Sequence, residues 1–271
     1  MLSSNAGKKI LGIHIGEKKV IIRFQDEKMS IHPNTYTELK LFPGKELTPK
    51  DIKDIENLDK LDEYLEYIKK VIAKAPKSEE DIKERLSKKG ANKTQIKTII
   101  EKLKRYHLID DKQLINDILD TCDYKCVGKN KIIETLKKKG IPSESINKIY
   151  FDDANELKKA KRLLPTLEKR CSKYNFASKK EHIYTALLRN GYDSDIAMQV
   201  VELAKPNEYK VELDILRKEY SRVYHRYERK YSKDDIDRKI TEYLLSKGYR
   251  YADINRVKGE KRKWKLTSSK I

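Results

Sequence analysis

The sequence predicts a mainly helical protein, in which tandem three-helix repeats form an elongated, curved array behind a small β-containing domain. Three observations predict this fold class. The hydrophobic period changes from two to about 3.6 near residue 48, and a segment ending in glycine then recurs four times. The apolar residues also stay periodic in a chain that is 39% charged. Repeats of this size contact mainly their neighbours, and we therefore expect an elongated array.

Residues 1–75 are expected to form a small β-meander followed by a helix. Three runs rich in β-branched residues are separated by short turns: ILGIHI (10–15), VIIRF (20–24) and MSI (29–31). The helix is predicted to begin at Thr48, a favoured N-cap residue, with Pro49 in the first helical position. From Ile52 to Ile72, apolar residues recur at intervals of three and four, as a helix with one buried face requires.

The strongest signal in the remaining sequence is an internal repeat. Four similar segments end around glycines that are 50, 51 and 57 residues apart: DIKERLSKKGA (Gly90), KIIETLKKKGI (Gly140), HIYTALLRNGY (Gly191) and KITEYLLSKGY (Gly248). In each segment an isoleucine stands eight residues before the glycine and a leucine four residues before it, which is the spacing of a buried helix face. We expect each glycine to end its helix in a left-handed conformation.

Further helices are expected after each glycine. A second helix is predicted to start at Asn92, Ser143, Asp193 and the segment 251–253. A third is predicted to start at Asp110-Asp111, Asp152-Asp153 and Lys205-Pro206-Asn207, the last of these reaching about Tyr231. The resulting modules are about 78–127, 128–177, 178–231 and 232–271, the last of them incomplete. The chain is therefore divided into an N-terminal domain, 1–75, and a helical repeat region, 76–271, that is expected to fold alone.

The charge distribution indicates a polyanionic or acidic partner. The formal net charge is +19, of which residues 1–75 carry +2, residues 76–202 carry +8 and residues 203–271 carry +9. A membrane surface is the alternative partner, but no apolar run approaches the roughly 20 residues of a spanning helix. The first residues also lack the apolar core of a signal peptide. We expect a cytoplasmic protein that does not bind membranes.

No motif in the sequence predicts catalysis, a cofactor or a metal site. The five histidines are scattered, and neither HExxH nor a phosphate-binding loop occurs. The acidic pairs at 110–111 and 152–153 stand at predicted helix starts, where capping is favoured over a two-metal site. Cys122, Cys126 and Cys171 are expected to be free thiols, because no further ligand completes a metal set. The protein is therefore expected not to be an enzyme.

Candidate binding residues cluster in basic segments. Tyr220, Tyr224, Tyr227 and Tyr231 share one face of a predicted helix, where they either pack inward or meet a partner. A neighbouring face and its flanks carry the candidate binding ridge: Arg217, Lys218, Arg222, Arg226, Arg229 and Lys230. Lys137, Lys138 and Lys139 either complement a helix terminus or add to a basic stripe. The segment Lys261-Arg262-Lys263-Trp264 fits single-stranded nucleic acid by charge and stacking, with a disordered solubilising end as the alternative.

The order of several short motifs resembles the RecX family. The motifs are SEEDI (78–82), LIDD (108–111), GKNKI (128–132) and KKGI (138–141), followed by RNGY (189–192) and SKGY (246–249). PGKEL (43–47), after the predicted strands, is similar to the extension of longer members. The resemblance covers residues 10 to about 256.

The resemblance implies a non-catalytic regulator of the RecA recombinase, and we expect a monomer without a cofactor. It implies three-helix modules that bind along the groove of a RecA filament on single-stranded DNA. Such binding modulates recombination, ATP hydrolysis and the coprotease activity of RecA, which belong to DNA repair and the SOS response. Two alternatives remain from the residues themselves: a nucleic-acid-binding protein that acts without RecA, and a helical-repeat scaffold for acidic proteins.

Overall fold

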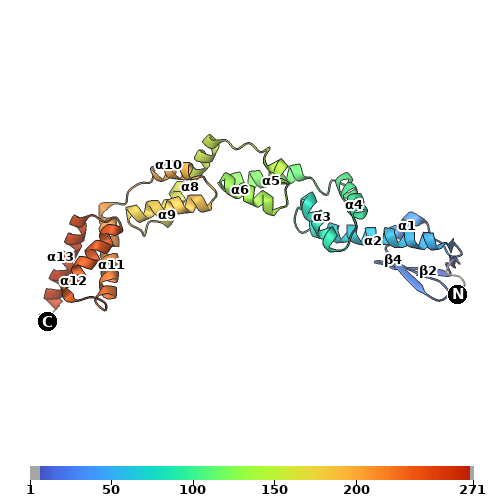
Figure 1. The fold of residues 1–271 in the computed structure, drawn as a ribbon, viewed down its shortest axis with the longest axis horizontal. Coiled ribbons are helices and arrows are strands. Elements are labelled where there is room, and N and C mark those ends of the chain that lie inside the picture. The colour runs from blue at the N-terminus through green and yellow to red at the C-terminus, as the bar shows by residue number, and fades with distance from the viewer. Residues whose placement is uncertain (1–6, 269–271) are drawn as a thin grey trace. The chain divides into compact units, whose positions relative to one another are not determined.

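A computed structural model of the chain describes residues 7–268, except for the side chains of 233–234 and 261–268. The described part is mainly helical with a small β region near its N-terminus, which confirms the predicted mainly helical fold class with an N-terminal β-containing region (Figure 1). The chain forms two compact units, one of Met1–Asp117 with Lys137–Ser145 and one of Ile118–Leu136 with Ile146–Ile271. Within the described residues, no helix is long and apolar enough to cross a membrane.

The N-terminal β region is the predicted meander with an additional strand pair. Its strands are β1 (Lys8–Lys9), β2 (Gly12–Ile15), β3 (Val20–Arg23), β4 (Lys28–Ile31) and β5 (Glu46–Leu47). The three middle strands form an antiparallel sheet in which Val20 lies opposite Ile31, and β1 pairs with β5. One face of the sheet is buried with Ile55 of α2 (Pro49–Ile72), while α1 (Pro33–Leu39) precedes β5. As predicted, Thr48 caps α2, with Asp51 completing a capping box.

The remaining helices follow the predicted repeat. They are α3 (Glu79–Lys88), α4 (Lys93–Arg105), α5 (Asp111–Tyr124), α6 (Lys129–Lys138), α7 (Ser143–Ile146), α8 (Asp153–Arg170), α9 (Phe176–Arg189), α10 (Ser194–Val201), α11 (Tyr209–Tyr227), α12 (Lys233–Ser246) and α13 (Tyr251–Ser268). The long helix α11 lies slightly inside its predicted bounds. All four repeat glycines have positive φ angles, which confirms the predicted helix ends after α3, α6, α9 and α12. The isoleucine and leucine of each repeat segment are buried.

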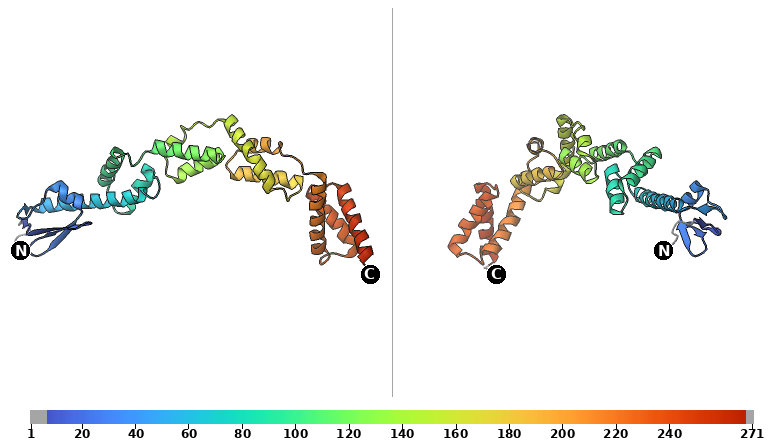
Figure 2. Two further views of the ribbon diagram at one scale, coloured as in Figure 1. Left: turned by 180° about the vertical axis from the view of Figure 1, so that it is seen from behind. Right: turned by 45° about the vertical axis from the view of Figure 1, so that its right-hand side comes forward.

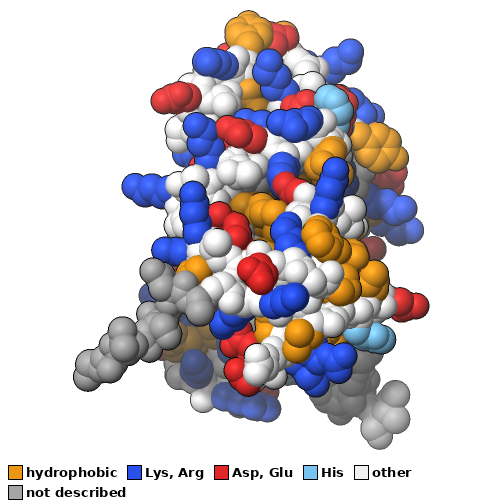
Figure 3. Space-filling view, turned by 90° about the vertical axis from the view of Figure 1, so that its right-hand side faces the viewer, with side chains coloured by type: hydrophobic (Ala, Val, Ile, Leu, Met, Phe, Trp, Pro, Cys, Tyr) orange, Lys and Arg blue, Asp and Glu red, His pale blue; other side chains and the backbone are white. Residues whose placement is uncertain are grey.

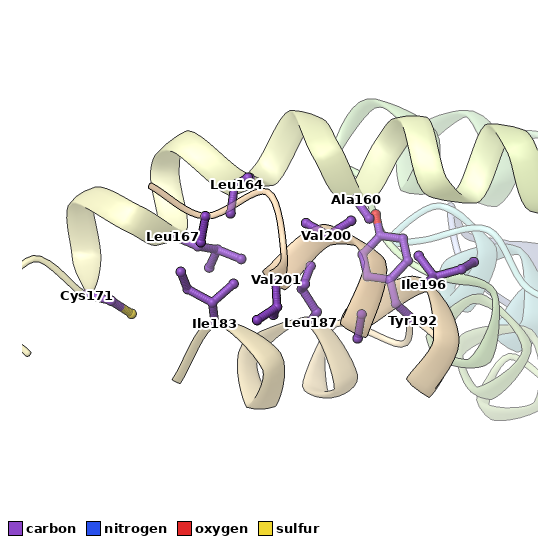
Figure 4. Close-up of a cluster of buried hydrophobic side chains, with 12 residues drawn as sticks. Ala160, Leu164, Leu167, Cys171, Ile183, Leu187, Tyr192, Ile196, Val200 and Val201 are labelled. Carbon is purple, nitrogen blue, oxygen red and sulfur yellow. The ribbon is translucent and has the colours of Figure 1, made fainter. Parts of the chain in front are cut away.

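The hydrophobic cores group the helices differently from the predicted modules. Leu65 and Ile68 of α2 share a core with α3 and α4. In the same way, α8 shares a core with α9 and α10, as Figure 4 shows around Tyr192. The helices α11, α12 and α13 share another core and lie side by side in both views of Figure 2. The long helix assigned to the end of one predicted module therefore belongs with the next two helices. The last group is a three-helix core, and α13 extends through Ser268.

A recurring joint connects the repeat glycines to earlier helices. In the first unit, the Ser78 hydroxyl, at the start of α3, donates a hydrogen bond to the Lys139 carbonyl at 2.6 Å. In the second unit, the Asn175 amide, at the start of α9, donates to the Lys247 carbonyl at 2.6 Å. Gly128 stands at the equivalent place before α6, and its backbone amide donates to the carbonyl of Asn190 at 2.9 Å. In each joint the carbonyl belongs to the residue before a repeat glycine.

The same joints supply a carboxylate to the first amide of the earlier helix. Asp111 accepts from the Glu79 amide, Glu156 from the Lys129 amide and Glu212 from the Phe176 amide, at 2.9, 2.8 and 3.0 Å. These amides have no partner inside their own helices, so the carboxylates satisfy them and complement the positive helix ends. Each joint therefore combines a helix cap with a tertiary contact.

Candidate nucleic-acid interface

Part of the predicted arginine ridge on α11 is engaged within the protein. Arg217 binds Asp214 and Glu260, and hydrogen bonds to these carboxylates raise the pKa of its guanidinium. Arg222 binds Glu219 at 2.6 Å but remains exposed. The ridge therefore presents less free positive charge than its sequence suggests.

The remaining cations of the ridge differ in their surroundings. The Arg226 guanidinium lies over the rings of Tyr227 and Tyr243, at 5.0 and 5.1 Å. Three further side chains are exposed: Lys218, Arg229 and Lys230. These positions stay accessible to a partner, although their part in binding is a prediction.

The tyrosines on the neighbouring face of α11 divide between the two alternatives. Tyr220 is buried, and Tyr224 and Tyr227 pack against the α11–α13 core. These three tyrosines thus follow the inward-packing alternative. Tyr231, beyond the end of the helix, is exposed.

The other predicted basic segments are only partly described. Lys137, Lys138 and Lys139 follow each other at the end of α6, and all three side chains are exposed. The carbonyl of Lys139 is used in the joint with Ser78. The four residues of the last basic segment have side chains outside the described residues: Lys261, Arg262, Lys263 and Trp264. Their part in binding stays a prediction.

The structure brings together five other cations in the second unit. They line one surface groove of about 710 Å³, here called the basic groove: Lys125, Lys131, Arg170, Lys173 and Arg189. Lys125 follows α5, Lys131 is on α6, Arg170 ends α8 with Lys173 just beyond it, and Arg189 ends α9. Among the residues that the structure describes, no Asp or Glu lines this groove. A polyanion would therefore meet only positive or neutral side chains there.

These five cations lack the carboxylate partners that occupy many others. Among the described residues, none of the five has a carboxylate oxygen within 4.0 Å. By contrast, between α3 and α4 of the first unit, Lys83 and Lys104 both lie against Glu79. Figure 3 shows the commoner arrangement on one face of the molecule, with Lys and Arg interspersed among Asp and Glu. Cations without a carboxylate partner retain their full attraction for phosphates, which makes the basic groove the strongest candidate interface.

A joint between helices builds the wall of the basic groove. Asn190 and Tyr192, which flank Gly191, both donate hydrogen bonds to the Cys126 carbonyl, at 2.8 and 2.6 Å. This contact holds the α5–α6 turn, with Lys125 beside it, against the end of α9. The cations are therefore placed by hydrogen bonds between residues 64 and 66 positions apart.

An aromatic pair extends the groove. The rings of Tyr174 and His182 are stacked with centroids 3.9 Å apart, and both residues line the basic groove. Together with Lys173 they also line a second groove of about 760 Å³, here called the mixed groove, between the start of α9 and the helices α11 and α12. The two grooves are thus joined at these three residues.

The basic groove was not predicted from the sequence. One signal for it was available: Lys125, Arg170 and Lys173 have no Asp or Glu three or four positions away, where helical ion pairs form. That signal identifies solvated cations but not their convergence, because the segments that carry them meet only in the tertiary structure.

The acidic pairs and cysteines have structural environments. Asp110 caps α5 and Asp152 caps α8, which confirms capping, while Asp111 binds the Glu79 amide instead of its own helix. All three cysteines are buried and free, and burial raises the pKa of the Cys122 thiol. In the part of the chain that the structure describes, no group of three His, Cys, Asp or Glu side chains could hold a metal ion.

The three-helix groups and the carboxylate-free groove define a helical-repeat protein with a basic surface. Over 151 residues the chain is 30% identical to the regulatory protein RecX of Clostridium perfringens, covering 52% of this chain and 68% of that protein. It is 24% identical to the RecX protein of Staphylococcus saprophyticus over 234 residues, which are 85% of this chain and 86% of the relative. The chain belongs to the RecX family of regulatory proteins.

Other RecX proteins match more of the chain at lower identity or share its fold. The RecX protein of Streptococcus gordonii is 22% identical over 92% of this chain and 98% of its own length. A crystal structure of regulatory protein RecX has the same fold, with a TM-score of 0.56 and 20% identity over 72% of this chain and 99% of that chain. No protein-family model matches the chain. The relatives are named as regulatory proteins and not as enzymes, and this chain is likewise a regulator rather than an enzyme.

Proposed function

We propose that this protein binds the RecA filament on single-stranded DNA and modulates its recombination, ATPase and coprotease activities without catalysis. Membership of the RecX family supports the partner, and this partner implies action in the cytoplasm. The observation that carries the proposal is the basic groove, in which five cations converge without a carboxylate. A filament offers the phosphates of its DNA and the acidic side chains of its protein to such a surface.

The groove predicts a defined electrostatic contribution to filament binding. Replacing Lys125, Lys131 and Arg170 by alanine removes three positive charges from one surface. Exposed ionic interactions of this kind contribute about 0.2–1 kcal/mol each, so filament affinity should fall roughly 3- to 150-fold. If these side chains reach phosphates, the slope of log affinity against log salt should flatten by about 0.7 for each phosphate interaction that is removed.

The control removes the same number and kind of charges from a part of α8 outside the basic groove. Lys158, Lys161 and Arg162 are exposed and lie outside the basic groove. Each triple variant is sedimented with RecA filaments of the same organism at two salt concentrations, and RecA ATP hydrolysis is measured in parallel. Loss of binding and of the effect on ATP hydrolysis in the groove variant alone supports the proposal. Equal filament binding by the groove variant, the control variant and the wild type would overturn it.

Binding without RecA is the second candidate, because the same groove suits a nucleic acid on its own. The titration of bare single-stranded DNA under the same conditions separates the two. If the protein binds bare DNA but leaves RecA sedimentation and ATP hydrolysis unchanged, the RecA-independent function is the correct one.

A further inference from the structure

The aromatic pair at the meeting point of the two grooves has the properties of a base-stacking platform. The Tyr174 and His182 rings are nearly parallel, at an interplanar angle of 28°. The His182 side chain is exposed, whereas Tyr174 is half-buried and packs against the α8–α10 core. One ring is thus anchored in the protein, and the other lies at the surface.

The platform is held in place before any ligand arrives. The Tyr174 carbonyl accepts a hydrogen bond from the Asn207 amide group at 2.9 Å, and the Tyr174 backbone amide donates to the Cys171 carbonyl at 3.1 Å. His182 is on α9, which Asn175 caps at its start. These contacts fix the backbone that carries the two rings, and the rings restrict each other by stacking. A base that stacks on them therefore loses less conformational entropy than it would on free side chains.

The mixed groove beyond the platform also favours an anionic strand. Its two carboxylates are both engaged with arginines, since Asp214 binds Arg217 and Glu219 binds Arg222. Besides Lys173, two further lysines line the same groove: Lys218 and Lys247. A strand that crosses the platform therefore leaves the five cations of the basic groove and meets further lysines on the other side.

We propose that the Tyr174–His182 pair stacks an unpaired base of single-stranded DNA whose phosphates follow the basic groove and continue into the mixed groove. This inference rests on the proposed function, because the DNA is the strand of the RecA filament. Stacking needs an exposed base face, which duplex DNA does not offer along its length. The charges alone bind any polyanion, whereas the platform distinguishes a strand that carries unpaired bases from one that does not.

The test separates stacking from charge with two strands of equal phosphate number. One is a thymidine oligonucleotide, and the other is a fully abasic strand. The wild-type protein should bind the base-bearing strand more tightly by roughly 5- to 150-fold, the range expected for one stacked base. The variant His182→Ala should lose this preference, and His182→Phe, which keeps an aromatic ring, should retain it. His225→Ala is the control, because His225 is also exposed but lies outside both grooves.

Each outcome bears on one proposal. Equal binding of both strands by the wild type, an unchanged preference in His182→Ala, or no measurable affinity for the base-bearing strand at low salt would overturn the platform. In all three cases the proposed function stands if the groove variant still loses filament binding. The groove variant should weaken both strands to the same extent, because it removes charges and leaves the rings in place.

Discussion

The hydroxyl of Ser78 donates a hydrogen bond of 2.6 Å to the carbonyl of Lys139, 61 residues further along the chain. The same hydroxyl oxygen accepts from the Asp81 amide at 3.2 Å, as the N-cap of α3. A Cβ atom on Gly140 would lie 2.8 Å from it, so the contact also depends on the absence of a side chain there. One serine therefore begins a helix and fixes the turn that follows another.

This double role predicts different costs for two capping serines. Ser78→Ala should lower the free energy of unfolding by about 2–3 kcal/mol, because it removes a cap and leaves the Lys139 carbonyl without this donor. Ser232 caps α12 through the Asp235 amide and is exposed, so Ser232→Ala should cost about 0.5–1 kcal/mol. Urea unfolding followed by circular dichroism measures both. Equal losses would show that the Ser78–Lys139 contact contributes nothing beyond the cap.

Gly90 and Gly191 provide a matched pair for testing the joint. Their φ angles are +92° and +94°, so alanine at either position should cost about 1–2 kcal/mol from the left-handed backbone alone. A Cβ on Gly191 would also lie 2.5 Å from the backbone nitrogen of Lys131, whereas at Gly90 its nearest neighbour is 3.9 Å away. Gly191→Ala should therefore lower the free energy of unfolding by about 1–3 kcal/mol more than Gly90→Ala does. The prediction fails if urea unfolding gives the two variants the same stability.

Asp193 predicts a pH-dependent contribution to stability. The Lys129 ammonium, with help from Asn130, lowers the pKa of the Asp193 carboxyl below its usual value of 3.8. A carboxyl whose pKa is lowered by folding stabilises the protein above the unfolded pKa, and this contribution disappears as the pH falls through the folded value. Asp193→Asn should thus lower the melting temperature at pH 7, and this difference should be smaller at pH 3. Melting curves at both pH values test this; a constant difference would exclude the ion pair as its cause.

The predicted boundary after residue 75 can be tested at the core of α3 and α4. The boundary predicts that 76–271 folds alone, yet Leu65 and Ile68 of α2 pack in that core. We expect a fragment of residues 76–271 to retain helical circular dichroism and cooperative melting, but with weaker hydrogen-exchange protection in α3 and α4 than a fragment of 48–271. Loss of the helical signal would refute the boundary, and equal protection would refute the contribution of α2.

The arginine ridge predicts a change in filament binding with little change in folding. Arg222→Ala and Arg229→Ala should each alter stability by no more than about 0.5 kcal/mol. Arg226→Ala should cost about 0.5–1 kcal/mol, because its guanidinium lies over Tyr227 and Tyr243. The triple variant should bind RecA filaments more weakly, with a flatter salt dependence. Unchanged affinity at two salt concentrations would remove this helix from the proposed interface and leave the basic groove.

The local structure of this protein was readable from its sequence. Isoleucine and leucine at fixed distances before each glycine predicted the buried face and the end of four helices, because periodicity and left-handed backbone geometry depend on nearby residues. The same holds for the cap at Thr48 and for the strands. Helical spacing placed Arg217 and Arg222 on one ridge, but it did not predict that both bind carboxylates, one of which stands 43 positions from Arg217.

Only the tertiary structure decided how the helices are grouped and where free positive charge gathers. The sequence predicts each helix, but it does not predict which three consecutive helices share a core. An amphipathic pattern shows that one face of a helix is buried, but it does not show which helix packs against that face. Lys125 and Arg189 line one groove because their neighbours are bonded to each other: Asn190 and Tyr192 donate hydrogen bonds to the Cys126 carbonyl. Such interactions depend on the folded positions of distant segments, which local patterns do not encode.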